Sequence, residues 1–436
     1  MPASSVLSRA GSFGTTYRSI KKLTLKESGI LFSLMRKAAL LALLLFSACS
    51  KKDTGTLAWW QFWTDPQTKP LVTELVTKFE KENPGVKVEV TDLTWADGHE
   101  KITVAFSAGQ PPDVLELGSD WIYEYASNKL LLDITPKAES LKKDLLFWQP
   151  ATLKGKVYAA PWVLGTRLMF YNFDLLNKAG FDDVPVKWDE LDKLNKKLAR
   201  FKPKIYGFGA NASERHRLYK KFLPFLWSAG GEILSEDGKT CFLNSSEGVQ
   251  ALKFYAELCQ RSLLATQANL DEAFLQGKLA SVISGDWLLK KLKNAPPKFG
   301  YTTALMPSPD GQLYSRTSFA GGEFLAIPAK SKKKDLAWRF VQFLVRPDNQ
   351  VYFCKNALIP TPASVTAQAD TFFLSDANYK TFIEQLQLAQ SSPSHPHWVE
   401  IEQAIEEAVE QAMYKKKSAK EALDEAAAKI NALLKS

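Results

Sequence analysis

Cysteine and histidine are both scarce in this chain, with four of each among 436 residues. No two cysteines have CxxC spacing, so a disulfide framework is not expected. A single bridge between Cys241 and Cys259 stays open for an oxidising compartment. The histidines include one close pair, His395 and His397, with no third or fourth ligand nearby in the sequence. No metal site is therefore predicted.

The signatures of common catalytic and cofactor sites are also missing. The chain contains no HExxH, GxSxG, GxGxxG or P-loop motif, which argues against the corresponding hydrolases and nucleotide-binding enzymes. SxxK patterns begin at Ser140 and Ser331, but a Lys-rich chain produces them by chance. No cofactor is predicted. Beyond the N-terminal region no apolar run reaches the length of a membrane span.

One short apolar run does stand near the N-terminus, over residues 38–46. It follows Met35-Arg36-Lys37 and leads into Ser47-Ala48-Cys49. A basic start, a brief apolar core and small residues at a cleavage point are typical of an export signal. The cysteine at that point resembles a bacterial lipoprotein signal, which implies that Cys49 carries a diacylglycerol and begins the mature protein. We expect residues 1–48 to be leader, with Met35 as the start, and residues 49–56 to be a tether.

Basic residues are concentrated in that leader. The formal net charge is +9, and residues 1–48 contain seven Lys or Arg and one Glu, which leaves +3 for the mature chain. The basic balance therefore does not indicate a nucleic-acid partner. A nearly neutral mature chain that holds all the tryptophans favours an uncharged ligand with an apolar face.

The mature chain is long enough for two domains, and its first part alternates strands with helices. The predicted order is strand 57–63, helix 65–82 with Asp65 as N-cap, strand 86–90, helix 99–108 and strand 113–117. This order predicts a parallel sheet covered by helices, with ligands at the carboxyl ends of its strands. Those ends lie near residues 63–65 and 118–121.

Later elements are predicted from the same patterns. Strands are expected at 156–161, 167–171, 280–284 and 319–327. Helices are expected at 188–198, 218–229, 245–261, 270–276, 333–344, 399–414 and 419–434. A capping box formed by Ser418 and Glu421 opens the last helix.

Short motifs recur in a familiar order along the chain. They are FEKENPGV at 79–86, AFSAGQPPDV at 105–114, YNFDLLNKAG at 171–180, WDEL at 188–191, GK at 277–278, GDW at 285–287 and KDLAW at 334–338. This ordered set resembles family 1 extracellular solute-binding proteins, the maltose-, oligosaccharide- and glycerol-3-phosphate-binding components of ABC importers.

The resemblance implies an α/β, two-lobed periplasmic-binding-protein fold of type II, with hinge crossovers and a ligand cleft. The crossovers are expected near 162–166, 319–322 and 358–361. The expected N-terminal lobe comprises 57–163 and 322–357, and the expected C-terminal lobe comprises 164–321 and 358–436. The function implied is capture of a sugar or oligosaccharide by a monomer, not an enzyme. It would be lipid-anchored in the periplasm or at the extracytoplasmic face and would deliver its ligand to permease subunits.

A sugar site needs aromatic platforms together with carboxylates or amides that bond hydroxyl groups. The candidate platforms are Trp63, Trp121, Trp227 and Trp287, with core packing as the alternative for each. The candidate polar contacts are Asp65, Asp120, Arg167 and Glu323. Asp65 could instead cap a helix, and Arg167 or Glu323 could instead form an interlobe salt bridge. Leu117 stands where maltose-type relatives carry an aromatic platform, which leaves the particular sugar open.

Two other functions stay open. Glycerol-3-phosphate or its diesters would require basic groups in the cleft, for which Arg167, Arg316 and Lys69 are the candidates. A glycosidase would require two carboxylates across the cleft, for which Asp120 and Glu323 are the candidates.

Overall fold

The computed structural model describes residues 55–435 except 202, 203 and 213. Cys49 and the expected leader and tether up to residue 54 lie outside the described residues. The first sheet has the strand order β2-β1-β3-β12-β6. Its strands are β1 (Gly55–Gln61), β2 (Val86–Asp92), β3 (Val114–Gly118), β6 (Ala159–Thr166) and β12 (Ala320–Ala326). Strands β1, β2 and β3 are parallel, whereas β12 runs antiparallel to both β3 and β6.

The second sheet has the order β11-β7-β10-β8-β9. Its strands are β7 (Leu168–Asn172), β8 (Gly209–Asn211), β9 (Leu263–Ala265), β10 (Ser281–Ser284) and β11 (Tyr301–Ala304). Strand β7 is antiparallel to both β10 and β11, whereas β8 is parallel to both β10 and β9. A small hairpin joins β4 (Thr152–Leu153) to β5 (Lys156–Val157).

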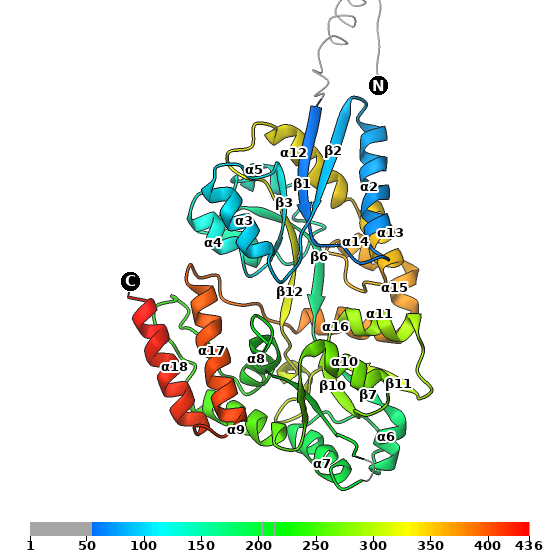
Figure 1. Cartoon of the computed structure of the whole chain (residues 1–436), viewed down its shortest axis with the longest axis vertical. Coiled ribbons are helices and arrows are strands. Elements are labelled where there is room, and N and C mark those ends of the chain that lie inside the picture. Colours follow the sequence, from blue (N-terminus) through cyan, green and yellow to red (C-terminus); the bar gives the residue numbers. More distant parts are fainter. Residues whose placement is uncertain (1–54, 202–203, 213, 436) are drawn as a thin grey trace, which may run out of the picture. The chain divides into compact units, whose positions relative to one another are not determined.

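Helices surround both sheets (Figure 1). Those up to β7 are α2 (Lys69–Glu82), α3 (Gly98–Ser107), α4 (Ile122–Ser127), α5 (Thr135–Ala138) and the 3-10 helix η1 (Gln149–Ala151). Those between β7 and β12 are α6 (Phe173–Lys178), α7 (Trp188–Leu198), α8 (Tyr219–Ser228), α9 (Ser246–Cys259), α10 (Gln267–Leu275), α11 (Asp286–Asn294) and the 3-10 helix η2 (Leu313–Ser315). The remainder are α12 (Lys334–Leu344), α13 (Pro347–Ala357), α14 (Val365–Gln368), α15 (Thr371–Ser375), α16 (Ala377–Gln387), α17 (Trp398–Met413) and α18 (Ala419–Leu433).

Helix α2 shows why these segments pack as they do. Its buried residues are Val72, Leu75, Val76 and Phe79, a spacing that places them along one face of a helix. Phe79 meets the ring of Phe340 on α12 at 4.9 Å between centroids. Burying this apolar stripe attaches α2 and α12 to the first sheet, since Trp59 of β1 also contacts Phe340.

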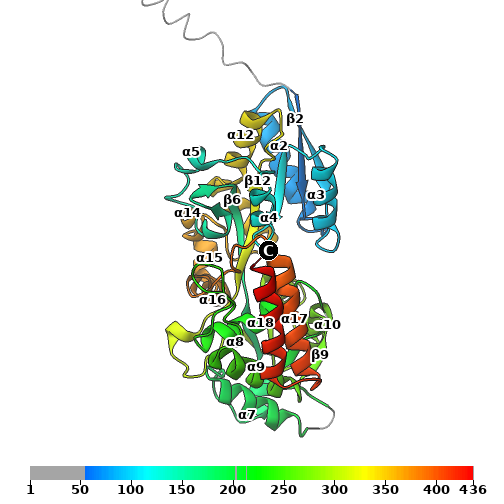
Figure 2. The ribbon, with the colours of Figure 1, turned by 90° about the vertical axis from the view of Figure 1, so that its left-hand side faces the viewer.

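Helices α8, α9, α17 and α18 pack together beside the second sheet (Figure 2). The predicted capping box of α18 is confirmed, because Ser418 accepts a hydrogen bond from the Glu421 backbone and the Glu421 side chain bonds the backbone N–H of Ser418. This reciprocal bonding satisfies two amides that the helix start would otherwise leave unpaired. The described cysteines Cys241, Cys259 and Cys354 are buried and free, so the structure does not contain the bridge left open by the sequence.

Three chain segments run side by side where the two sheets meet. Strand β6 ends at Thr166 and β7 begins at Leu168, so Arg167 connects the sheets. The returning segment is bonded to it, because Ser318 Oγ donates to the Arg167 carbonyl at 2.6 Å. The third segment passes at Gln390, whose N–H donates to the Ser318 carbonyl and whose carbonyl accepts from the Ala320 N–H.

Two of these crossings differ from expectation. Residues 162–166 were expected to form a link but continue strand β6. The third crossing was expected at 358–361, yet Ser364 Oγ still donates to Asp144 Oδ2, which lies between α5 and η1. Helix α16 already contacts the second sheet, because Asp376 pairs with Lys293 of α11 and Asn378 accepts from the Thr303 N–H of β11. We therefore propose lobe boundaries near Arg167, Phe319 and Asp376.

The helix expected from Asp65 begins later, at Lys69. Asp65 Oδ1 accepts hydrogen bonds from the N–H groups of Gln67 and Thr68, at 3.0 and 3.2 Å. Asp65 thus closes a turn ahead of the helix, in the way that Asx residues bond their own backbone two residues on.

Candidate functional site

The carboxyl end of β3 is linked directly to the elements of the second sheet. Asp120 Oδ2 accepts hydrogen bonds from Tyr219 OH at 3.1 Å and from Lys220 Nζ at 3.0 Å. Burial raises the pKa of Asp120, but the adjacent Lys220 charge and hydrogen bond outweigh burial and hold that pKa below its usual range. Asp120 is therefore an ionised carboxylate that joins the two halves of the molecule.

A second link lies at the turn after β1. Asp65 Oδ1 pairs with Lys290 Nζ of α11 at 3.2 Å. Beside this pair, Asn294 of α11 donates to Gln67 Oε1 at 3.0 Å. Both links begin at carboxyl ends of parallel strands, where open α/β sheets place their ligands.

Arg167 lies at the crossing between the sheets, against two aromatic rings. Its guanidinium carbon is 4.7 Å from the ring centroid of Trp287 and 5.9 Å from that of Phe319. Lys221 Nζ also lies over Trp287, at 5.4 Å. Cations are attracted to aromatic faces in this geometry. The Trp287 ring, expected to be a sugar platform, therefore supports two cations.

A buried polar group fixes the position of Trp287. Its Nε1 donates to Asp271 Oδ2 at 2.9 Å, and Asp271 is 1% exposed. The other Asp271 oxygen accepts from Ser284 Oγ and Gln267 Nε2, each at 2.9 Å. These bonds anchor the indole to α10 and to the end of β10.

Two carboxyl groups lie on neighbouring strands of the first sheet. Burial, helped by nearby Asp286 and opposed by Arg167, raises the pKa of Glu323 on β12 to about 8. Glu116 on β3 is fully buried, and its Oε2 accepts from the Phe62 N–H at 3.1 Å. Burial, helped by Glu323, raises the pKa of Glu116 well above its usual range. Both groups favour the neutral acid, because ionising a carboxyl in a poorly solvated site is costly.

The other three predicted platforms are packed among hydrophobic neighbours. Trp121 is 8% exposed and Trp227 is 6% exposed. Trp227 stacks on Phe319 with ring centroids 6.4 Å apart, so it packs against the segment that crosses between the sheets. Trp63 is partly buried and meets the edges of Trp162 and Phe353. The structure thus brings together Asp120, Arg167, Trp287 and Glu323, with Asp65 at the rim, while these three indoles lie mainly in the packing.

Trp95 is an aromatic residue at this boundary that sequence reasoning missed. Its ring stacks on Phe62 with centroids 4.2 Å apart and an interplanar angle of 19°, and 42% of the residue is exposed. A side chain at Gly118 would come within 2.8 Å of Asp120 Oδ1 and 3.3 Å of the Trp95 ring. Gly118 therefore lets an exposed indole lie close to the Asp120 carboxylate.

The other basic candidates for a phosphate site are engaged elsewhere. Lys69 pairs with Asp92, and Arg316 donates to the carbonyls of Met306 and Leu305 at 3.0 and 2.8 Å. Lys220 and Lys221, which were not predicted, are the basic residues that join Arg167.

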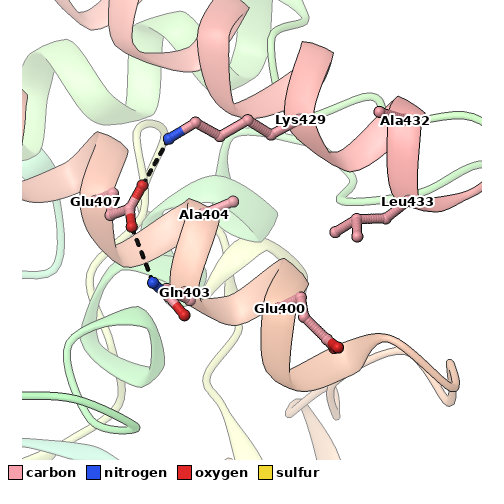
Figure 3. A pocket seen from close by; sticks show the side chains of 7 residues that line it. All are labelled: Glu400, Gln403, Ala404, Glu407, Lys429, Ala432 and Leu433. Carbon is pink, nitrogen blue, oxygen red and sulfur yellow. Dashed lines mark hydrogen bonds and ion pairs between the residues drawn. The ribbon is translucent and has the colours of Figure 1, made fainter.

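Two depressions lie outside this cluster. A narrow crevice beside Asp120 is lined by Ser119, Asp120, Tyr123, Pro150 and residues 391–394. An open groove separates α17 from α18, and Lys429 and Gln403 both bond Glu407 across or along it (Figure 3). The groove lies away from the carboxyl ends of the strands, so the chemistry of the site does not involve it.

The described residues offer no grouping of three or more His, Cys, Asp or Glu suited to a metal ion. Within the same part of the chain, no helix has both the length and the apolarity needed to cross a bilayer.

Comparison with known proteins gives consistent matches. The family model for bacterial extracellular solute-binding proteins matches residues 65–351. A binding protein of Brucella abortus is 28% identical over 409 residues, which cover 92% of this chain and 98% of the relative. A maltooligosaccharide ABC transporter solute-binding lipoprotein of Streptococcus pneumoniae is 27% identical over 391 residues, covering 83% of this chain and 88% of the relative. A solved ABC transporter solute-binding protein from Thermotoga lettingae, bound with α-D-tagatose, superposes with a TM-score of 0.79 at 26% identity and covers 87% of this chain and 100% of that protein. The predicted two-lobed α/β fold is confirmed by these likenesses.

Proposed function

Because the chain belongs to the family of bacterial extracellular solute-binding proteins, we propose that it captures a sugar or oligosaccharide between its two lobes and delivers it to an ABC permease. The relatives named above bind maltooligosaccharide or α-D-tagatose, as their names state. The observation that carries the proposal is the meeting of polar groups from both sheets at Asp120, beside the exposed ring of Trp95. Sugars present hydroxyl groups and an apolar ring face, which such a combination can bind.

Calorimetric titration tests this function directly. The purified mature protein is titrated with a panel of monosaccharides and oligosaccharides, and separately with glycerol-3-phosphate and its diesters. We expect saturable heat from at least one saccharide. Heat from the glycerol phosphates alone would contradict the sugar proposal and leave the alternative function standing.

The Trp95→Ala variant probes the exposed platform. We expect its sugar affinity to fall about tenfold, since one aromatic stacking contact is worth roughly 1–3 kcal/mol in analogous sites. The thermal midpoint should fall only modestly, because 42% of the residue is exposed although the ring stacks on Phe62. Phe173→Ala is a matched control, as Phe173 is 39% exposed on α6 of the other lobe. Equal affinity of Trp95→Ala and wild type would exclude Trp95 from the site.

We propose that the protein is a binder and not an enzyme. The proposal is supported by the match to a family of solute-binding proteins, and Asp120, one of the two candidate carboxylates, is engaged in an ion pair with Lys220 and a hydrogen bond from Tyr219. Incubation with oligosaccharides should leave them intact when followed by chromatography, whereas released monosaccharide would support the glycosidase alternative.

The export signal supports attachment of the mature protein to a membrane through lipidated Cys49, as a monomer outside the cytoplasm. A diacylglycerol supplies two chains, and two chains anchor a protein firmly where one does not. We expect Cys49→Ser to appear in the soluble fraction or as an uncleaved precursor on immunoblots. A variant that is cleaved and retained in the membrane like wild type would contradict lipidation.

A further inference from the structure

Three cations surround the two aromatic rings at the crossing, and among the described residues only one of them forms a direct ion pair. Lys220 Nζ lies 5.4 Å from the Phe319 centroid and pairs with Asp120. Arg167 and Lys221, which lie over Trp287, form no ion pair with a carboxylate anywhere in the described chain. Arg167 Nη1 donates to the Thr166 carbonyl at 3.2 Å.

Lys221 is the more costly of the two unpaired cations. It is 3% exposed, and its Nζ donates to the backbone carbonyl of Ile283 at 3.3 Å. Burial lowers the pKa of Lys221, and the charge of Arg167 lowers it further. Two like charges that share one aromatic ring without a direct ion pair oppose folding. A group of opposite charge bound at this point would relieve that repulsion.

The acidic residues nearby compensate these charges only in part. Burial lowers the pKa values of Arg167 and Lys221. Asp286 and Glu323 raise the pKa of Arg167, and Asp271 and Glu214 raise the pKa of Lys221, but burial outweighs them and both pKa values stay lowered. The pKa of Glu323 is about 8, so this side chain is mostly protonated and uncharged at neutral pH. Burial raises the pKa of Asp286 as well, although Arg167 opposes the shift. Asp271 is taken up by hydrogen bonds from Trp287, Ser284 and Gln267 and by an ion pair with Lys291 at 3.5 Å.

We propose that Arg167 and Lys221 form a binding site for an anionic group, a carboxylate or a phosphate, carried by the saccharide ligand. The inference rests on the proposed sugar-binding function and narrows it to acidic saccharides. The overall charge of the mature chain led us to expect an uncharged ligand, and this proposal replaces that expectation. Net charge describes the whole protein, whereas the two cations at Trp287 are a local feature. Arginine suits such a group because its fork of N–H donors matches the geometry of carboxylate and phosphate oxygens.

Calorimetry with matched sugars tests the preference. The wild-type protein is titrated with galactose, galacturonate and galactose 6-phosphate, and with glucose, glucuronate and glucose 6-phosphate. At least one acidic sugar should bind tenfold or more tightly than its neutral parent, equivalent to about 1.4 kcal/mol. Comparison of the uronates with the phosphates identifies which anion the site takes. Added salt should weaken binding of the acidic sugar more than binding of the neutral one.

Two variants separate ligand binding from folding. Lys221→Met keeps the length of the side chain and removes its charge, so the thermal midpoint should rise while the preference for the acidic sugar falls at least tenfold. Arg167→Gln should reduce the same preference. Lys293→Gln is the matched control on α11, because Lys293 pairs with Asp376 away from Trp287. It should keep the wild-type preference.

The outcomes are distinguishable. Equal or tighter binding of the neutral parents, or an unchanged preference in both folded variants, would overturn the anionic site. Absence of heat with every sugar, together with heat from glycerol-3-phosphate, would refute the sugar proposal while supporting the cationic site. Absence of heat with all of these compounds and with the full saccharide panel of the first titration would overturn both.

Discussion

Replacement of Trp287 by alanine is expected to weaken saccharide binding at least tenfold, or about 1.4 kcal/mol. The indole supports Arg167 and Lys221 on its ring and donates a hydrogen bond to Asp271. Without the ring both cations lose their platform, and Asp271 loses a donor at a buried position. Because leaving a buried polar group unpaired is itself costly, the free energy of unfolding should also fall, by about 2–3 kcal/mol for this partly buried ring.

Trp287→Phe separates the two roles of this side chain. Phenylalanine keeps an aromatic face for the cations but cannot donate to Asp271. We expect Trp287→Phe to retain affinity within a few fold of wild type and to be destabilised, as measured by calorimetry and by urea unfolding. If Trp287→Ala is destabilised but binds the saccharide with wild-type affinity, Trp287 contributes only to packing of the core.

The stability of the protein should fall as the pH rises from about 5 to about 9, and Glu323→Gln should remove much of this fall. The folded-state pKa of Glu323 is about 8, against an ordinary value of 4.5. Between these values the unfolded chain has released the proton that the folded chain keeps, so rising pH favours unfolding. The full effect is about 1.4 kcal/mol per pH unit. Partial solvent contact of the side chain reduces the total to about 2–4 kcal/mol.

Urea unfolding at pH 5, 7 and 9 measures this effect. Glu323→Gln should be close to wild type at pH 5 and more stable than wild type at pH 9. Glu89→Gln, at an exposed position on β2, controls for the loss of one carboxylate. A constant difference between Glu323→Gln and wild type at all three pH values would show that Glu323 ionises normally in the folded protein.

Local sequence patterns predicted those helices and strands whose own residues determine their conformation. The helix predicted at 188–198 has those same bounds, and the cap of α18 forms as expected. The short strands β8, β9 and β11 were not predicted; β8 and β9 have only three residues each, which carry too little periodicity to be recognised. The third crossing, ahead of Asp376, was missed for another reason. It depends on contacts of α16 with Lys293 and Thr303, which lie far away in the sequence.

The clustering of candidate residues was predictable in part. Asp120, Arg167, Trp287 and Glu323 were proposed from their places at strand ends and crossings, and the structure brings them together. Their contacts with a ligand stay predictions. Lys220 and Lys221 were missed because they read as the solvated start of a helix, and only tertiary packing brings them against Phe319 and Trp287. The presence of a tryptophan in the sequence did not distinguish a ligand platform from a core residue, because the ring is largely buried in both roles.

The central claim is that one ligand is held by both lobes at once. Hydrogen–deuterium exchange of the wild-type protein, with and without a saturating saccharide that gives heat in calorimetry, tests this most directly. The account predicts that slower exchange appears together at residues 63–65 and 118–121 beside the first sheet and at residues 219–221 and 285–287 beside the second. Slower exchange confined to one of these two sides at saturation would contradict it.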